Sequence, residues 1–358
     1  MNSYITSIST AKPKFKVEQS QALDFMSKVN GMDKDEKHNL EVLYRATGIE
    51  SRFSVLEDFT LPPDKSEYFN TTGTPSTAER LDLFKEEALK LSFDSAKDCI
   101  SKSGVSGEQI THIITVSCTG LHAPGLDIDL IYKLGLQHNV ERLAINFMGC
   151  YAAFNAIKAA DAICQSSEAK VLIICTELCS IHFQKGKDED TLLANALFGD
   201  GSAALMVESI PTKCKSLKIT SAHCDLLPAG KSEMAWGVGD FGFEMKLSSY
   251  VPDVISTGIS TLLKNYSEHF DYYAIHPGGK RILKVIEEQL NITKEQNIQA
   301  HEVLRQHGNM SSPTILFVLK HIFDDLTEAD AQKDILAMAF GPGLTLESLT
   351  FKITLDNA

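Results

Sequence analysis

The stretch Asn146-Phe147-Met148-Gly149-Cys150-Tyr151-Ala152-Ala153-Phe154 joins two different patterns. Leu143 to Phe147 has the apolar character of a strand, and a helical pattern runs from Cys150 to Ser166. Cys150 is therefore expected in the first turn of a helix, where unpaired N–H groups favour a thiolate and lower the pKa of a thiol. The pattern predicts a nucleophilic cysteine. The alternative is a structural cysteine, because free cysteines are commonly buried.

Strands and helices alternate on both sides of this junction. In the first half, strands are expected at His112 to Ser117, Leu143 to Phe147, Lys170 to Cys175 and Ala203 to Glu208, and helices at Leu126 to Leu134, Cys150 to Ser166 and Ala194 to Leu197. In the second half, helices are expected at Val251 to Asn265, Gly279 to Leu290 and Met310 to Phe323, and strands at Tyr272 to Ile275 and Ile335 to Phe340. The alternation predicts an α/β fold with parallel strands.

The two halves, residues 1–209 and 210–358, repeat one order of elements. Met148-Gly149-Cys150 opens a helix that is followed by a strand, and His307-Gly308-Asn309 opens another such unit. An internal duplication would bring Cys150 and Asn309 together about a pseudo-twofold axis.

The N-terminal region precedes this alternation. A strand is expected within residues 1–12, followed by helices at Glu18 to Asn30 and Leu40 to Thr47 and a long helix at Leu81 to Ser103. The segment from Asp58 to Pro75 is expected to be a loop, which together with Arg45 and Arg52 would face solvent.

Composition excludes several classes of protein. The chain has 358 residues and a formal net charge of −13, which argues against nucleic acid or an anionic membrane surface as the main partner. No apolar run reaches the length of a membrane span, and the N-terminus lacks the pattern of a secretory signal, so we expect a cytoplasmic protein. The eight cysteines are expected to be reduced thiols, and no metal-binding motif is present.

Two further residues complete a possible catalytic set. His276 follows a strand in Ile275-His276-Pro277-Gly278-Gly279, at the kind of strand end where α/β folds form pockets. Asn309 lies in Gly308-Asn309-Met310-Ser311-Ser312, where a helix N-cap is the alternative explanation. A cysteine could attack an acyl carbon, an imidazole could hold the thiolate as an ion pair, and the Asn amide and His N–H could stabilise an oxyanion.

Five motifs in this order resemble the type III polyketide synthases, the chalcone- and stilbene-synthase-like group, over nearly the whole chain. They are Met148-Gly149-Cys150-Tyr151-Ala152, Ala196-Leu197-Phe198-Gly199-Asp200-Gly201-Ser202-Ala203-Ala204, Ile275-His276-Pro277-Gly278-Gly279, Gly308-Asn309-Met310-Ser311-Ser312 and Phe340-Gly341-Pro342-Gly343-Leu344-Thr345. The resemblance implies the thiolase fold, with two duplicated αβαβα halves in five layers, and a homodimer. Within that family, the resemblance implies a bacterial member of the alkylpyrone or alkylresorcinol type.

The same resemblance implies roles for individual residues. Cys150, His276 and Asn309 would form the catalytic triad. Phe183 and Phe243 would be aromatic gatekeepers, with core aromatics as the alternative, and Cys118, Thr119 and Ala123 would line the cavity, Ala123 across the dimer. The CoA phosphates would be bound by Lys280 and Arg281, helped by Arg45 and Arg52, with ordinary surface charges as the alternative.

The implied reaction loads a starter acyl group from CoA onto Cys150 and extends it repeatedly with malonyl-CoA, by decarboxylation and Claisen condensation. CoA thioesters are substrates, and no metal, cofactor or acyl carrier protein is expected. A fatty acyl starter and a pyrone or resorcinol-type product are expected.

Three alternatives share the fold. An initiating ketoacyl-ACP synthase makes one condensation, but it typically has His-Gln-Ala-Asn where this chain has His276-Pro277-Gly278-Gly279. A thiolase needs a second cysteine near the C-terminus, whereas the last cysteine here is Cys224. A non-catalytic thiolase-fold subunit would lack the triad, all of whose residues are present.

Overall fold

The computed structural model describes residues 2–69, 73–248, 250–266 and 269–355. Nine strands form one sheet in the order β11-β12-β13-β8-β1-β7-β6-β4-β5. Their bounds are β1 Tyr4–Ala11, β4 His112–Ser117, β5 Glu141–Asn146, β6 Lys170–Leu178, β7 Asp200–Glu208, β8 Ser216–Leu226, β11 Tyr272–Ile275, β12 Asp334–Gly341 and β13 Thr345–Thr354. The sheet is continuous at its centre through a short β1–β8 pairing, in which Tyr4 faces Lys218 and Ile5 faces Leu217.

The strand order repeats on either side of the β1–β8 pairing. On one side β1, β7 and β6 are antiparallel neighbours, and β6, β4 and β5 are parallel. On the other side β8, β13 and β12 are antiparallel neighbours, and β12 and β11 are parallel. The sheet is therefore mixed, whereas the alternating pattern predicted parallel strands only. The repeated order agrees with the predicted duplication, although the boundary between residues 209 and 210 stays a prediction.

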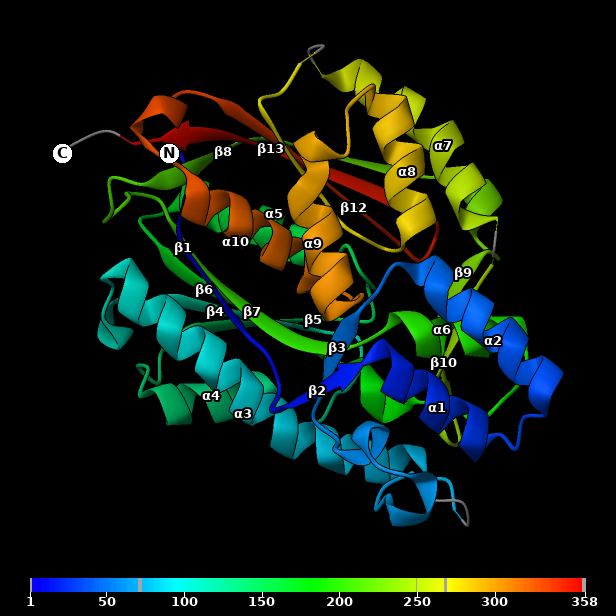
Figure 1. Ribbon diagram of the computed structural model, residues 1–358. Helices are drawn as coiled ribbons and strands as arrows, with labels where there is room; N and C mark the ends of the chain where they lie inside the picture. The colour runs from blue at the N-terminus through cyan, green and yellow to red at the C-terminus, as the bar shows by residue number, and fades with distance from the viewer. Residues whose placement is uncertain (1, 70–72, 249, 267–268, 356–358) are drawn as a thin grey trace.

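The helices make three layers around the two parts of the sheet (Figure 1). The outer helices α3 (Thr77–Ser103) and α4 (Leu126–Leu134) pack on the first half of the sheet. On the second half, α7 (Val251–Leu262) packs on β8 and β13, with α8 (Lys280–Leu290) beside it. Between them lie α5 (Ala152–Ser166), which contacts β4, β6 and β13, and α10 (Thr314–Asp325), which contacts β1, β7 and β11. This is the five-layered αβαβα arrangement of the thiolase fold.

A smaller group of elements lies beside α6, on the right in Figure 1. It comprises β2 Phe15–Glu18, α1 Gln19–Val29, α2 Lys34–Thr47, β3 Ser51–Ser54, α6 Glu189–Leu197 and the hairpin of β9 Met234–Gly239 and β10 Gly242–Leu247. The helix α9 (Ile298–His307) contacts β3 and so connects this group to the second half. The predicted loop from Asp58 to Pro75 contains two 3-10 turns, and its residues 70–72 lie outside the described residues.

Helix boundaries follow local capping more closely than apolar periodicity. The side chains of Ser76 and Glu79 form a capping box, so α3 begins at Thr77, before the first apolar residue that the periodicity detects. It ends at Gly104, which has a φ of 77° and closes the helix in the left-handed conformation.

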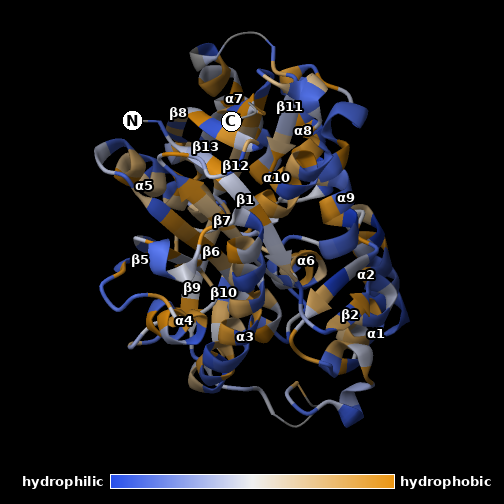
Figure 2. Cartoon of the chain, turned by 90° about the vertical axis from the view of Figure 1, so that its left-hand side faces the viewer, coloured by the Kyte–Doolittle hydropathy of each residue, from blue (hydrophilic) through white to orange (hydrophobic). Residues whose placement is uncertain are grey.

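Apolar side chains concentrate in two cores, visible as the orange interior in Figure 2. One core surrounds α5 and α10 between the two halves of the sheet, and the other lies between the first half and α3. None of the helices in the described part of the chain has the length and apolar character needed to span a membrane. The cytoplasmic location stays a prediction.

Candidate active site

Cys150 lies in a tight turn between β5 and α5, two residues before the first residue of α5. Gly149 has a φ of 84°, and a Cβ there would lie only 2.3 Å from Cδ of Pro342. A Cβ at Gly341 would lie 2.6 Å from the ring of Tyr151. Both positions therefore need glycine, because the segment after β12 presses directly against the turn that carries Cys150.

Asn309 reaches Cys150 from the other half of the molecule. Its Oδ1 and Nδ2 atoms each lie 3.9 Å from the Sγ of Cys150. The N–H of Ser311 donates to Oδ1 at 2.8 Å, which turns Nδ2 toward the carbonyl of Gly278 at 3.4 Å. The predicted juxtaposition of Cys150 and Asn309 is thus confirmed.

The backbone at Asn309 differs from the prediction. Asn309 does not open a helix: it forms a parallel bridge with Phe198, in which its N–H donates to Leu197 O at 2.9 Å and Gly199 N–H donates to its carbonyl at 2.9 Å. The helix α10 begins only at Thr314. The helix N-cap explanation for Asn309 is therefore wrong, since its main chain is held by the Phe198 motif of the first half.

His276 lies at the end of β11 with 1% of its surface exposed. Its N–H donates to Met338 O at 2.8 Å, and neither ring nitrogen has a hydrogen-bond partner among the described residues. A Cβ at Gly278 would lie 3.8 Å from Nε2, so this glycine leaves the space beside the imidazole open. An orphaned buried imidazole facing a cavity is available to a substrate.

Burial opposes an isolated charge on either member of this pair. It raises the pKa of the Cys150 thiol to about 11 and lowers the pKa of the His276 imidazole to about 3. The sequence predicted a lowered pKa for Cys150 because it placed the thiol in a helical first turn. That prediction is wrong, since Cys150 precedes the helix and only 7% of its surface is exposed.

The three residues line one apolar cavity, which we call the Cys150 chamber. It holds about 630 Å³ of empty space. Its remaining lining residues are Cys118, Thr119, Gly149, Cys179, Phe198, Met234, Trp236, Met245, Leu247, Gly278, Ile282, Ser311, Phe340 and Pro342. Cys118 and Thr119 therefore lie where the sequence predicted them.

A buried carboxylate, Glu177, supports one wall of this chamber. It accepts hydrogen bonds from the Cys118 N–H at 2.9 Å, the Thr119 hydroxyl at 2.7 Å and the Ser312 hydroxyl at 2.6 Å. Burial raises the pKa of Glu177, which these hydrogen bonds oppose. Sequence reasoning missed this residue, although it follows the buried run Val171–Cys175 at a strand end, which is the signal used for His276.

The two predicted gatekeepers are not part of the chamber. Phe183 packs edge-on against Phe25 and Phe59, with ring centroids 5.7 and 5.6 Å away. Phe243 stacks on His182, with centroids 4.1 Å apart and an interplanar angle of 8°. The aromatic residues on the chamber wall are Phe198, Trp236 and Phe340. The Ala196–Ala204 motif contained Phe198, but sequence reasoning did not single it out.

Phe198 also borders a second cavity of about 890 Å³, which we call the outer channel. Trp236, Met245 and Cys179 likewise line both the channel and the Cys150 chamber. These four side chains thus separate the chamber from the channel. Phe183 and Phe243 line the channel but not the chamber.

The predicted cations divide into two groups. Arg45, Lys280 and Arg281 are exposed, and Arg281 pairs with Asp253 at 3.1 Å. Lys280 lies against Gly48 at the end of α2, the helix that carries Arg45, because a Cβ at Gly48 would lie 3.1 Å from the Lys280 side chain.

Arg52 does not share this surface. It is only 8% exposed, and its guanidinium donates to Asn195 O at 2.8 Å and Phe198 O at 2.5 Å. Its expected position in a solvent-facing region is wrong, because all four residues of β3 are buried and the Arg52 side chain turns toward the main chain at the end of α6. Arg52 holds the main chain of the Phe198 motif.

Ala123 lies in the loop after β4 and is exposed, with a cis peptide bond to Pro124. It does not line the Cys150 chamber of the single chain. In the described part of the chain no cluster of histidine, cysteine and acidic side chains has the arrangement of a metal site.

The fold and this Cys-His-Asn site define a condensing acyltransferase of the thiolase fold. Residues 2–211 match the family described as chalcone and stilbene synthases, N-terminal domain, and residues 218–354 match its C-terminal domain. The chain belongs to the chalcone and stilbene synthase family and is a type III polyketide synthase.

Relatives from several kingdoms support this assignment. The alpha-pyrone synthesis polyketide synthase-like Pks18 of Mycobacterium tuberculosis is 29% identical, covering 98% of this chain and 91% of that protein. Type III polyketide synthase A of Arabidopsis thaliana is 31% identical over a match that covers 88% of this chain and 84% of that protein. The crystal structure of PKS-I from the brown alga Ectocarpus siliculosus superimposes with a TM-score of 0.91 at 30% identity, covering 98% of both chains.

Proposed function

We propose that this type III polyketide synthase loads a fatty acyl group from CoA onto Cys150 and extends it iteratively with malonyl-CoA to a pyrone or resorcinol-type product. The observation that carries the proposal is the meeting of Cys150, His276 and Asn309 in one buried chamber, with the Asn309 amide 3.9 Å from the thiol. CoA thioesters are the substrates, and no acyl carrier protein is required.

Loading begins with proton transfer from the Cys150 thiol to His276. Because burial disfavours either charge alone, the charged state is a thiolate–imidazolium pair formed by both residues together. The thiolate attacks the starter thioester carbonyl, the carbon–sulfur bond to CoA breaks, and the leaving CoA thiolate takes the proton from His276. The products are the Cys150 thioester, free CoA and a neutral imidazole.

Extension depends on hydrogen bonds to the substrate, whereas loading depends on proton transfer between Cys150 and His276. The amide of Asn309 and the N–H of His276 bind the thioester oxygen of malonyl-CoA. As the carboxylate leaves as CO2, its bonding electrons form an enolate, whose negative oxygen these donors stabilise. The enolate carbon attacks the acyl carbonyl on Cys150 and expels the thiolate, which gives a β-ketoacyl-CoA two carbons longer. Return of that chain to Cys150 repeats the cycle.

We propose that the CoA moiety enters through the outer channel and passes Phe198, the side chain shared by channel and chamber. Arg45, Lys280 and Arg281 are the proposed partners of the CoA phosphates. The position of Lys280 against Gly48, at the end of the helix that carries Arg45, supports this assignment, because a chain with a net charge of −13 needs a local cationic surface for an anionic substrate.

We also propose a homodimer formed through the edge strand β5. Within the described residues β5 pairs only with β4, and the exposed apolar residues Leu121, Leu143 and Met148 lie on or beside this edge. An unpaired apolar strand edge is a template for pairing with another chain. Ala123 lies in the loop beside this edge, so in such a dimer Ala123 would face the partner chain.

The test is mass spectrometry of products from purified enzyme, malonyl-CoA and a panel of acyl-CoA starters, without carrier protein. Tri- or tetraketide pyrones or resorcinols are expected, and they should disappear with Cys150→Ala. A single β-ketoacyl product that forms only after addition of malonyl carrier protein would instead assign an initiating ketoacyl-ACP synthase activity and contradict the proposal.

A further inference from the structure

Phe147, three residues before Cys150, has a strained backbone. Its φ is 60°, in the left-handed region that bulky side chains rarely adopt. The chain continues through Met148 and Gly149 into the turn that carries Cys150, so the backbone direction at Phe147 affects where the thiol lies. A strained conformation of this kind persists only where the surrounding structure holds it.

Both the ring and the main chain of Phe147 are held. Its ring packs on the ring of Phe243 from β10, with centroids 5.2 Å apart and planes tilted by 54°. Because Phe243 is only 1% exposed, its ring has little freedom to move. The N–H of Phe147 donates to Ser117 O at 3.3 Å, at the end of β4.

Phe243 is fixed in turn by His182, from the 3-10 turn η4 (Cys179–His182). The two rings stack with centroids 4.1 Å apart and an interplanar angle of 8°. The N–H of Phe243 donates to Nδ1 of His182 at 3.0 Å, so Nε2 carries the proton and donates to Thr119 O at 2.6 Å. Burial lowers the pKa of His182 to about 3, which keeps the imidazole neutral and both hydrogen bonds in place.

A second residue of the β9–β10 hairpin reaches the same loop. The indole N–H of Trp236 on β9 donates to Cys118 O at 2.7 Å, and its ring meets Phe243 edge-on with centroids 5.9 Å apart. The turn before α5 also rests on this loop, because the N–H of Gly149 donates to Sγ of Cys118 at 2.9 Å. The hairpin, the loop after β4 and the turn before α5 are therefore one connected unit.

We propose that Phe243, held by His182, is a positioning residue for the nucleophile. The rings of Phe147, Phe243 and His182, which we call the aromatic clamp, hold the strained backbone so that the turn keeps the Cys150 thiol beside Asn309. Phe243 lines the outer channel, but its contact with Phe147 gives it a role other than that of a gate. The effect of the clamp on catalysis rests on the proposed loading of Cys150.

Two substitutions at Phe147 test the clamp. Phe147→Ala and Phe147→Gly both remove the ring, but only glycine adopts a positive φ without strain. Each protein is incubated with p-nitrophenyl acetate, a small activated ester without a CoA moiety, and acylation is followed by mass spectrometry of the peptide that contains Cys150. Phe147 is only half-buried, so the fold should tolerate both changes, and a circular-dichroism melting curve checks it.

Acylation of Cys150 should slow by roughly tenfold in Phe147→Ala, because an alanine without the clamp leaves the left-handed conformation by about that factor. Phe147→Gly should stay within about threefold of the wild-type rate, since glycine keeps this conformation unaided. If the two variants lose the same rate, or if both keep the wild-type rate, the ring does not hold the backbone and the proposal is overturned.

A double substitution tests the partner ring. Phe243→Ala should slow acylation of Cys150 as Phe147→Ala does, and addition of Phe147→Gly to Phe243→Ala should restore most of the lost rate. No rescue would overturn the role of Phe243. If Phe243→Ala does not fold, the two Phe147 variants decide the question alone.

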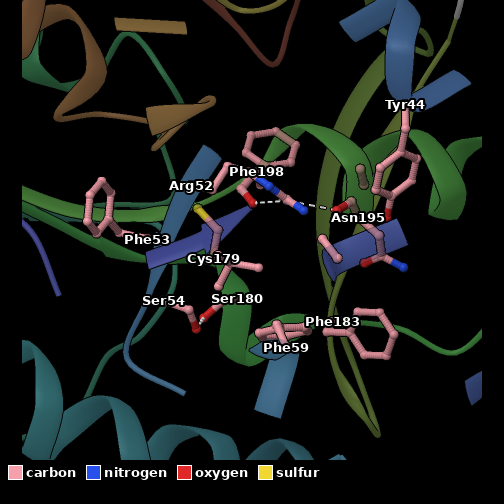
Figure 3. A pocket seen from close by; sticks show the side chains of 13 residues that line it. Tyr44, Arg52, Phe53, Ser54, Phe59, Cys179, Ser180, Phe183, Asn195 and Phe198 are labelled. Carbon is pink, nitrogen blue, oxygen red and sulfur yellow. Dashed lines mark hydrogen bonds between the residues drawn. The ribbon is translucent and has the colours of Figure 1, made fainter. Parts of the chain in front are cut away.

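Phe183→Ala is the control for this rescue. Phe183 also lines the outer channel, but it belongs to a separate aromatic group, in which its ring packs edge-on against Phe59 (Figure 3). Whatever the rate of Phe183→Ala, addition of Phe147→Gly should not raise it. An equal rescue of Phe183→Ala and Phe243→Ala would contradict a specific contact between Phe243 and Phe147.

The kinetics separate positioning from gating and from the proposed function. With acyl-CoA, Phe147→Ala should lower the maximal rate of Cys150 loading with little change in the half-saturating concentration, whereas loss of a gate would raise that concentration. If the ester acylates the variants as expected but wild-type enzyme makes no pyrone or resorcinol, the proposed function fails while the clamp stands. If products form but the two Phe147 variants acylate alike, the clamp fails while the proposed function stands.

Discussion

At the scale of single residues, the site joins two groups whose charges are each unfavourable. Burial alone lowers the pKa of His276, and burial is also the largest cause of the raised pKa of Cys150. A charge on one is therefore stable only with the opposite charge on the other. The imidazole should behave as a weak base whenever the thiol is absent.

Removing Cys150 isolates this effect. Cys150→Ala should still decarboxylate malonyl-CoA, because the enolate needs His276 and Asn309 but no thiolate. Since the pKa of His276 is lowered to about 3 and the neutral form predominates above it, the rate should stay constant as the pH rises from about 5 to 8. The measurement is CO2 release against pH. A rise with a midpoint near the ordinary histidine value of about 6.5 would contradict it.

Decarboxylation should require the amide N–H donor of Asn309, and a side chain of the same shape without that donor should not replace it. In Asn309→Asp the carboxylate can still accept from the Ser311 N–H but no longer donates to the thioester oxygen. Decarboxylation kcat should fall by about 10²–10³, as for other lost oxyanion donors, with a smaller change in KM. Steady-state kinetics measures both, and a circular-dichroism melting curve checks the fold. Equal kcat in the two proteins would remove Asn309 from the proposed mechanism.

At the scale of elements, the turn before α5 depends on glycine. Gly149→Ala places a Cβ in the left-handed conformation and 2.3 Å from Cδ of Pro342. We expect a loss of about 3 kcal/mol or more in the free energy of unfolding, and loss of activity from a displaced Cys150. Urea unfolding measures the first and product formation the second.

Gly135→Ala is the matched control for that substitution. Gly135 has a φ of 67° at the end of α4, and a Cβ there would meet nothing within 4 Å. Only the conformational cost of about 1 kcal/mol is expected, with activity retained. If both variants lose the same stability, the contact with Pro342 is not what requires glycine at residue 149.

The strand β3 gives a second prediction at this scale. Arg52→Met leaves the Asn195 and Phe198 carbonyls without their donor and should lower the free energy of unfolding by about 3 kcal/mol. Arg45→Ala should leave stability within about 0.5 kcal/mol and raise the KM for malonyl-CoA. Denaturant unfolding and kinetics separate the two. A stable Arg52→Met with only a raised KM would return Arg52 to the CoA-binding surface.

The sequence predicted the elements better than the contacts between them. The strand His112–Ser117 and the helix Leu126–Leu134 are confirmed, because an apolar run and a helical period are both local patterns of sequence. The bridge between Phe198 and Asn309 was missed, since no local pattern reports a pairing across 111 positions of sequence. Motifs likewise brought Cys150 and Asn309 together, whereas the wall residue Trp236 depends on packing that only the folded chain defines.

At the scale of the whole molecule, the duplication explains how the site forms at all. The helices α5 and α10 both lie in the middle layer, and the turns before them carry Cys150 and Asn309. Each half alone would present only part of the site. The separation of the site from solvent thus follows from the five-layered packing, and neither half is expected to decarboxylate malonyl-CoA without the other.

The edge strand β5 extends this reasoning beyond one chain. Leu143 is 42% exposed on β5, the last strand of the sheet, and the turn to Cys150 begins directly after it. Leu143→Glu places a charge where two apolar edges would meet. We expect sedimentation velocity to change from a dimer to a monomer of 39.4 kDa, with activity reduced because the turn that carries Cys150 loses its support from the partner.

Ile210→Glu is the control for that substitution, since Ile210 is 60% exposed after β7 and away from this edge. It makes the same kind of change in charge and should leave a dimer. A wild-type protein that sediments as a monomer would contradict the proposed assembly. A dimer that survives Leu143→Glu would place the interface on another surface, and Ala123 would then have no partner chain to face.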